Sequence, residues 1–287
     1  MRIVLLGDLH FYQLAVWPWQ LLSKRLLGQT NLWLNRRRHF DLSLWPVTRE
    51  HLLSLKPELL LGSGDFTTTA LPSEFNQAFT HLRPLLDEPS LETLLVPGNH
   101  DRYTFSSKRQ CLFEKALGAW TCDDWPCVRT FGDRMVICLD PTRPNKWNAS
   151  GLVGQTQRDR LAELLANAPE GKAIIVLCHY PIGTPPDLKP EAYAHGLEDK
   201  QALGKVLCDS GRRILMVHGH IHWPWQWDYN DNPNVTTINA GAPMLKCRHY
   251  PYGQGFVSLD WAPGEAWPSA ITRHVRDANG AWIANSG

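Results

Sequence analysis

Five short apolar runs in this sequence, each typical of a β-strand, end in polar side chains that bind metal ions or transfer protons. The runs cover residues 3–6, 59–61, 94–96, 173–177 and 214–217. The polar side chains after them are Asp8, His10, Asp65, Asn99, His100, Asp101, His179, His220 and His222. In an extended segment, Asp8 and His10 project to the same side, so that a carboxylate and an imidazole can reach one cation. The same chemistry at five strand ends predicts one shared site.

Seven of these side chains supply nitrogen and oxygen atoms of the kind that divalent metals bind. They are Asp8, His10, Asp65, Asn99, His179, His220 and His222. This set exceeds what one tetrahedral ion needs, so two ions that share a ligand are the more economical arrangement. Asp65 is the natural bridge, because a carboxylate can give one oxygen to each ion. Mixed imidazole and carboxylate sets suit Mn, Fe, Zn, Co or Ni, and we expect Mn²⁺.

The segments around these runs predict an α/β domain. Helix-like segments at residues 47–56, 72–87, 154–167 and 201–209 alternate with the apolar runs. This alternation favours parallel strands, and parallel sheets bind ligands at the carboxyl ends of their strands. After His222 the pattern changes to short strand-like runs without a helix, which predicts a second, largely antiparallel sheet. No linker or repeat divides the chain, so residues 1–287 are predicted to form one domain.

The composition is typical of a soluble globular protein. With 287 residues and 43% hydrophobic content the chain can bury a large core, and its net charge of +1 gives no reason to expect a nucleic-acid partner. Seven cysteines without a C-x-x-C pair fit reduced thiols. The first apolar run is broken at Gly7-Asp8, unlike a secretory signal, and no run is as long as a membrane-spanning helix. We therefore expect a cytoplasmic protein.

Residues 11–45 form a basic segment rich in tryptophan and leucine, which we predict to be an insertion or lid beside the site. Residues 9–40 contain no Asp or Glu, and Pro18 is well placed to begin a helix. Four apolar side chains fall near one face of that helix, namely Trp19, Leu22, Leu26 and Trp33. Such a face can bind an acyl chain or lie peripherally at the inner membrane surface. Alternatively, it packs on the domain and only the basic side is solvated.

The ordered motifs resemble those of the calcineurin-like metallophosphoesterase superfamily. They are Asp8-Leu-His10, Gly64-Asp65, Gly98-Asn-His-Asp101, His179 and Gly219-His-Ile-His222, followed by a glycine turn at residues 239–243. The resemblance implies a four-layer α/β/β/α sandwich in which two mixed sheets are flanked by helices. It also implies one metal held by Asp8, His10, Asp65 and His222, and a second held by Asp65, Asn99, His179 and His220. The family often has a further aspartate after the bridging one, but Phe66-Thr-Thr-Thr69 stands there.

This resemblance implies a binuclear metal-dependent phosphoesterase that hydrolyses a phosphodiester, phosphomonoester or pyrophosphate bond. A hydroxide held between two cations exists at neutral pH because the cations lower the pKa of bound water, and it can attack phosphorus in line. We expect His100 to stabilise the transition state or to protonate the leaving oxygen, and Asp101 to orient its ring. His218 lies before the Gly-His-x-His motif, so we expect it either to pack in the core or to contact a metal ligand rather than the metal.

Three functions are compatible with such a site. An amphiphilic, lipid-linked phosphoester or pyrophosphate would contact residues 11–45 beside the metals. A small-molecule phosphodiesterase, such as a cyclic nucleotide hydrolase, would need no such contact. A catalytically silent scaffold would use the fold to bind proteins, but such relatives typically lose a metal ligand or the motif histidine, and none is lost here.

Overall fold

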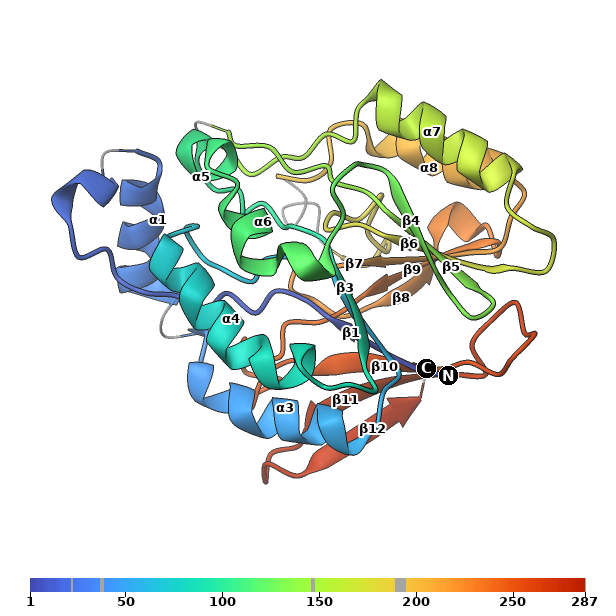
Figure 1. Cartoon of the computed structure of the whole chain (residues 1–287). Coiled ribbons are helices and arrows are strands. Elements are labelled where there is room, and N and C mark those ends of the chain that lie inside the picture. Colours follow the sequence, from blue (N-terminus) through green and yellow to red (C-terminus); the bar gives the residue numbers. More distant parts are fainter. Residues whose placement is uncertain (22, 37–38, 146–147, 189–194, 287) are drawn as a thin grey trace.

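Two six-stranded sheets form the framework of the protein in a computed structural model, which describes residues 1–21, 23–36, 39–145, 148–188 and 195–286 (Figure 1). In spatial order, the first sheet contains β12 (Trp282–Ser286), β11 (Ala270–Arg276), β10 (Phe256–Asp260), β1 (Arg2–Leu6), β2 (Leu59–Gly62) and β3 (Glu92–Leu95). The second contains β4 (Cys127–Phe131), β5 (Arg134–Cys138), β6 (Ala173–Leu177), β7 (Ile214–His218), β9 (Val235–Asn239) and β8 (Gln226–Asp228). Both sheets are mixed, as the sequence predicted.

Helices cover the outer face of each sheet, which gives the predicted four layers. The helices α3 (Trp45–Ser54), α4 (Pro72–Leu86) and α6 (Leu112–Leu117) lie on the first sheet, whereas α7 (Gln155–Ala166) and α8 (Lys200–Asp209) lie on the second (Figure 1). Shorter helical segments are α5 (Phe105–Arg109), η4 (Gly118–Trp120) and η6 (Tyr229–Asp231). Among the described helices, none combines the length and the hydrophobicity that crossing a bilayer requires.

Side chains of the central strands alternate between two apolar layers. In β1, Val4 and Leu6 pack with the helices, whereas Ile3 and Leu5 pack between the two sheets. All four side chains are buried, and this is why the strand reads as an uninterrupted apolar run. The parallel pairs β1–β2 and β2–β3 then bring the carboxyl ends of these strands to the same edge.

The strands after His222 are divided between both sheets, so the predicted separate antiparallel sheet is wrong. β9 pairs in parallel with β7, and β8 pairs antiparallel with β9. β10, β11 and β12 instead extend the first sheet from the free side of β1. Each group satisfies the backbone hydrogen bonds of an edge that would otherwise be unpaired, and the choice of edge depends on contacts distant in the sequence.

We call residues 11–45 the cap. It contains η1 (Pro18–Leu21), α1 (Arg25–Asn31), η2 (Leu32–Arg36) and η3 (Leu42–Leu44) rather than one continuous helix, and Leu22 lies outside the described residues. In Figure 1 the cap projects from the left edge of the molecule beside α5. Residues 11–45 therefore form short helical pieces beside the loops that follow β2 and β5.

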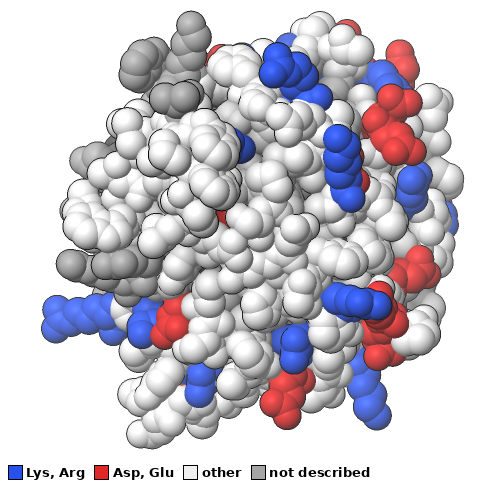
Figure 2. Space-filling view, turned by 60° about the vertical axis from the view of Figure 1, so that its left-hand side comes forward, with Lys and Arg blue, Asp and Glu red and all other residues white. Residues whose placement is uncertain are grey.

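Several large apolar side chains between residues 14 and 34 of the cap are exposed. Trp19, Leu26 and Trp33 are 62%, 52% and 55% exposed, and Trp17 stacks on Trp19 with ring centroids 4.8 Å apart. Figure 2 turns this side toward the viewer and shows a broad, mostly uncharged surface on its left-hand side. The alternative in which the apolar face packs on the domain predicts less exposure than these side chains show.

The inner side of the cap is attached by polar contacts instead. Gln29, which is buried, donates through Nε2 to the Gln13 carbonyl at 3.1 Å and to Thr69 Oγ1 at 3.0 Å. Arg25 donates to the carbonyls of Thr69 and Ala70 at 2.9 and 2.6 Å. Buried apolar side chains, among them Leu32 and Phe40, join these polar contacts on the inner side of the cap.

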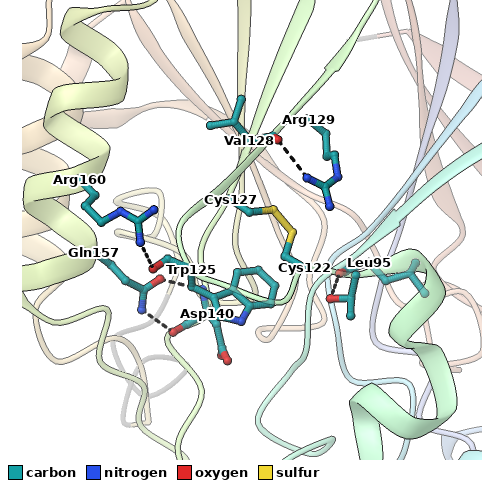
Figure 3. Close-up of a disulfide and its surroundings, with 10 residues drawn as sticks. Leu95, Cys122, Trp125, Cys127, Val128, Arg129, Asp140, Gln157 and Arg160 are labelled. Atoms are coloured by element: carbon teal, nitrogen blue, oxygen red, sulfur yellow. Dashed lines mark hydrogen bonds between the residues drawn. A yellow bond between two sulfur atoms is a disulfide. The ribbon is translucent and has the colours of Figure 1, made fainter.

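Cys122 and Cys127 form a disulfide, so the expectation of reduced thiols is wrong for this pair (Figure 3). Their Cα atoms are 6.3 Å apart across the loop that leads into β4. Cys138 lies opposite Cys127 in the β4–β5 pair and remains a thiol. The pairing depends on how this loop enters the sheet, which the spacing of the cysteines in the sequence does not reveal.

Candidate metal centre

The carboxyl ends of five strands meet at the junction of the two sheets and bring the seven predicted ligands together. From the first sheet, β1 is followed by Asp8 and His10, β2 by Asp65 and β3 by Asn99; from the second, β6 is followed by His179 and β7 by His220 and His222. Ligand atoms of six of these residues fall into two groups, Asp8–His10–Asp65–His222 and Asp65–His179–His220, each within 4.8 Å. Asn99 contacts the second group.

The first group converges on one point. His10 Nε2 lies 3.0 Å from His222 Nε2, and His222 Nε2 lies 3.3 Å from Asp8 Oδ1. Two nitrogens bound at right angles to one ion, each at about 2.1 Å, lie about 3 Å apart. The separation of the two imidazole nitrogens therefore fits a shared cation.

The second group surrounds the side-chain oxygen of Asn99. Asn99 Oδ1 lies 3.0 Å from His179 Nε2 and 2.9 Å from His220 Nδ1. His179 Nδ1 donates to the Ser63 carbonyl at 2.7 Å, which fixes the ring and leaves Nε2 to bind a metal. The donor set of two imidazoles, an amide oxygen and a carboxylate suits a divalent transition metal.

Asp65 connects the two groups through a single oxygen. Its Oδ2 lies 3.5 Å from His10 Nε2 in the first group and 3.4 Å from His179 Nε2 in the second. Its Oδ1 accepts the backbone N–H of His100 at 2.8 Å, which holds the carboxylate in this orientation. The near-equal distances support the bridging position that the sequence predicted for Asp65.

The backbone at the strand ends is shaped for this convergence. Five of the ligands have left-handed φ angles between 50° and 75°: Asp8, His10, Asp65, His220 and His222. Such conformations are costly for non-glycine residues and are found mainly where the surrounding structure enforces them, often at functional sites. A Cβ atom at Gly219 would lie 2.4 Å from Asp8 Oδ2, so only glycine lets the β7 loop approach this carboxylate so closely.

The charges of the centre are strongly coupled. Burial favours a raised pKa for Asp65, but the positive charges of His179, His100 and His10 hold it well below its usual range. Burial opposes protonation of His179, but the charge of Asp65 raises its pKa to about 9. Burial and His179 together lower the pKa of His220 well below its usual range. The site thus favours a cation between these groups, and a bound metal would take the place of the His179 proton.

Asp101 does not orient the His100 ring, contrary to the sequence-based expectation. Its carboxylate accepts the backbone N–H groups of Gly98, Thr67 and Phe66 at 2.9, 2.9 and 3.3 Å. His100 Nδ1 instead lies 2.5 Å from the Thr68 carbonyl, to which it donates. Asp101 therefore fixes the β2 and β3 loops to each other, because a short buried carboxylate is the nearest acceptor for those amides.

Two further residues define the surroundings of His100. The Thr68 carbonyl sets its tautomer, and the Tyr103 ring stacks on it with centroids 5.3 Å apart. Neither residue belongs to a motif that the sequence shows. The only sequence signal for Tyr103 was an aromatic residue three positions after His100. The contact with the Thr68 carbonyl had no signal, because backbone carbonyls leave no pattern in the side chains. His218 is buried against Trp225 and burial lowers its pKa to about 3, which agrees with a packing role.

A four-layer α/β fold with linked Asp and His clusters at its strand ends defines the metallophosphoesterase class. The sequence profile of the calcineurin-like phosphoesterase family matches residues 1–224. The chain belongs to this family and is a metal-dependent phosphoric ester hydrolase. No curated protein matches the chain.

Solved structures show the same fold at low sequence identity. A dimetal phosphatase from Danio rerio is 12% identical with a TM-score of 0.61, and the match covers 99% of this chain and 98% of that one. The sulfate thiohydrolase SoxB from Thermus thermophilus is 13% identical with a TM-score of 0.50, and the match covers 99% of this chain but 56% of SoxB. At these identities the likeness shows the fold alone.

Proposed function

We propose that the two groups hold two Mn²⁺ ions and that the protein hydrolyses a phosphodiester, phosphomonoester or pyrophosphate bond there. The observation that carries this proposal is Asp65 Oδ2, which lies 3.5 and 3.4 Å from a histidine of each group. Bound divalent ions lower the pKa of the attacking water and neutralise the phosphoryl oxygens. The water oxygen forms a new bond to phosphorus, the bond to the leaving oxygen breaks, and one water proton passes to that oxygen.

We assign the delivery of this proton to His100. Its Nδ1–H is held by the Thr68 carbonyl, so the proton to be transferred must be carried by Nε2. Its ring lies edge-on to that of the ligand His10, with centroids 4.8 Å apart, which places it beside the first group. A protonated His100 can therefore donate to a leaving oxygen bound at this edge of the centre.

A metal-supplemented assay tests the proposed reaction. Wild-type protein with Mn²⁺ should hydrolyse esters from a panel that includes p-nitrophenyl phosphate and bis-p-nitrophenyl phosphate. Asn99→Ala should lose at least roughly a hundredfold in kcat/KM, because the second group loses its central oxygen. Asn167→Ala, an exposed residue at the end of α7, is the control and should keep full activity. Unchanged activity of Asn99→Ala would contradict the assignment.

We further propose an amphiphilic, lipid-linked substrate and a peripheral position at the cytoplasmic membrane face. Exposed tryptophan and leucine side chains of the cap support this: Trp17, Trp19, Leu26, Leu27, Trp33 and Leu34 are each 47% to 62% exposed. Aromatic and aliphatic side chains gathered on one exposed face are characteristic of interfacial membrane contact. Because Cys122 and Cys127 form a disulfide, reduced thiols no longer support the predicted cytoplasmic location. Cell fractionation tests this location.

Co-sedimentation with vesicles tests the membrane contact. Wild-type protein should sediment with phosphatidylglycerol vesicles, and the Trp17→Ser/Trp19→Ser variant should bind several-fold more weakly because it loses the stacked indole pair. Ile283→Ser, which is 41% exposed on β12, is the control outside the cap. Equal sedimentation of all three proteins would reject the contact.

Two alternatives make different predictions. A small-molecule phosphodiesterase should turn over cyclic nucleotides or bis-p-nitrophenyl phosphate rapidly without detergent and irrespective of the cap. A silent scaffold should hold both metals and hydrolyse no ester of the panel. The second alternative has little support, because no predicted ligand is missing from the centre.

A further inference from the structure

A cavity of about 650 Å³ lies between the cap and α5. Its walls include Trp19, Leu26, Leu27, Tyr103, Phe105 and Ser106. This volume lies within the range of cavities that hold small organic ligands, and such cavities are mostly lined by apolar side chains. Trp19, Leu26 and Leu27 line the cavity while 52% to 62% of each side chain stays exposed, so the cavity opens on the same exposed surface of the cap.

This cavity adjoins the metal centre through a smaller one. A second cavity, of about 290 Å³, is lined by His100 and Thr68. Lys24, Leu27 and Tyr103 line both cavities, so the two meet at these side chains. A ligand can therefore extend from His100 into the space beneath the cap.

Lys24 is the cation at this junction. Its Nζ lies 4.8 Å from the centroid of the Tyr103 ring, whose other neighbour in the stack is His100. Nζ donates one hydrogen bond to the Asn148 carbonyl at 2.5 Å, and no carboxylate of the described chain forms an ion pair with it. An ammonium group has three donors, so two remain for a ligand. The neighbouring Arg25, by contrast, is engaged by two backbone carbonyls.

We propose that the cavity between the cap and α5 binds the hydrocarbon chain of the substrate and that Lys24 binds an oxygen of its phosphoryl head. This inference rests on the proposed function and names its substrate class, a phosphoester or pyrophosphate with one long alkyl or prenyl chain. The apolar walls receive the chain, the metal centre receives the phosphoryl group, and Lys24 marks the boundary. A hydrogen bond from an ammonium to a phosphoryl oxygen is among the stronger polar contacts in proteins.

A series of soluble esters tests the cavity. Ethyl, octyl and tetradecyl p-nitrophenyl phosphates share one leaving group, and each is assayed below its critical micelle concentration without vesicles, so that lipid surfaces cannot contribute. Burial of one methylene is worth roughly a fourfold change in binding. We expect kcat/KM of the wild type to rise at least roughly a hundredfold from the ethyl to the octyl ester.

Ser106→Trp places an indole in the cavity from α5 and should abolish the rise, measured relative to the same variant's own rate on the ethyl ester. Leu26→Asp, at a position that is 52% exposed, makes the wall polar without disturbing the core and should also weaken the dependence on chain length. Thr80→Trp, on the exposed side of α4, is the control and should preserve the dependence. Chain-length dependence that both cavity variants retain would overturn the assignment of the cavity.

Lys24→Met keeps the aliphatic stem but removes the charge, and we expect kcat/KM for all three esters to fall by about tenfold or more. Lys24→Arg should restore part of that loss, and Lys115→Met on α6 should have no effect. If the wild type hydrolyses the three esters equally, the inference fails while the proposed function stands. If it hydrolyses neither these esters nor p-nitrophenyl phosphate or pyrophosphate, the proposed function fails. Calorimetric binding of octylphosphonate against methylphosphonate then still decides the inference, with equal affinities rejecting it.

Discussion

His100 and Asp101 are neighbours in the sequence, but their side chains serve different parts of the molecule. The His100 ring is held by the Thr68 carbonyl at the edge of the metal centre. The Asp101 carboxylate accepts three backbone amides and lies completely within the protein. We infer that His100 acts on the substrate, whereas Asp101 maintains the loops that carry the ligands.

The proton-donor role predicts a dependence on the leaving group. His100→Asn should slow hydrolysis of an alkyl ester by roughly a hundredfold or more, since its alkoxide needs a proton. Hydrolysis of a p-nitrophenyl ester should slow much less, because p-nitrophenolate leaves without protonation. Steady-state kinetics on matched esters measure the difference, and metal content should be unchanged. Equal losses on both esters would assign His100 to binding instead.

In the loop that follows β7 and carries His220 and His222, Gly219 sets how closely the backbone approaches Asp8. The Gly219→Ala methyl group would lie 2.4 Å from Asp8 Oδ2, so the carboxylate must shift away from the first group. We expect metal content to fall below that of the wild type and activity to fall with it. Gly118→Ala, where a methyl group meets nothing within 4 Å, is the matched control. Full metal content in Gly219→Ala would show that the carboxylate position is not critical.

The cap is anchored through Glu74 of α4. Its carboxylate accepts the backbone N–H of Gln13 in the cap at 3.3 Å and that of Thr69 at 2.8 Å. Burial is the larger influence and raises the pKa of Glu74 from 4.5 to about 7, although these amides oppose the change. The folded protein therefore retains a proton that the unfolded chain loses between these pH values.

This shift predicts the sign of a pH dependence. As pH rises from 4.5 to about 7, the unfolded state binds fewer protons at this position than the folded state, so the free energy of unfolding falls. The loss amounts to at most roughly 3 kcal/mol. Glu74→Gln should remove this loss. In urea titrations, the free energy of unfolding of the variant should therefore rise relative to that of the wild type as pH increases from 4.5 to about 7. In Glu170→Gln, an exposed control, the free energy of unfolding should change with pH as it does in the wild type. If Glu74→Gln also shows the pH dependence of the wild type, the raised pKa of Glu74 is contradicted.

Local sequence patterns predicted the elements well where both faces of a strand are buried. β1, β2, β6 and β7 appear where the apolar runs indicated, because continuous burial gives an unbroken apolar signal. The placement of the C-terminal strands could not be predicted, since the edge that a strand joins is a non-local choice. The orientation of the cap was also inaccessible, because Gln29 and Arg25 bind backbone carbonyls that no sequence pattern reports.

At the scale of the whole molecule, the centre joins the two sheets. His222, from the second sheet, completes the group formed by Asp8, His10 and Asp65, whereas Asn99, from the first, completes the group of His179 and His220. That the seven proposed ligands lie together was predictable, because parallel strand ends collect at one edge. Their distances, and with them the bridging role proposed for Asp65 Oδ2, depend on how the sheets pack.

We propose that the two groups bind two metal ions and that hydrolysis requires both. The most direct measurement is elemental analysis of metal-stripped protein titrated with Mn²⁺, with turnover of bis-p-nitrophenyl phosphate followed in the same samples. We predict two ions bound per wild-type chain, turnover that rises with the second ion, and an Asp65→Asn variant that loses both full occupancy and turnover. Full turnover with one ion or none, or two bound ions without turnover of any phosphoester, would contradict the account.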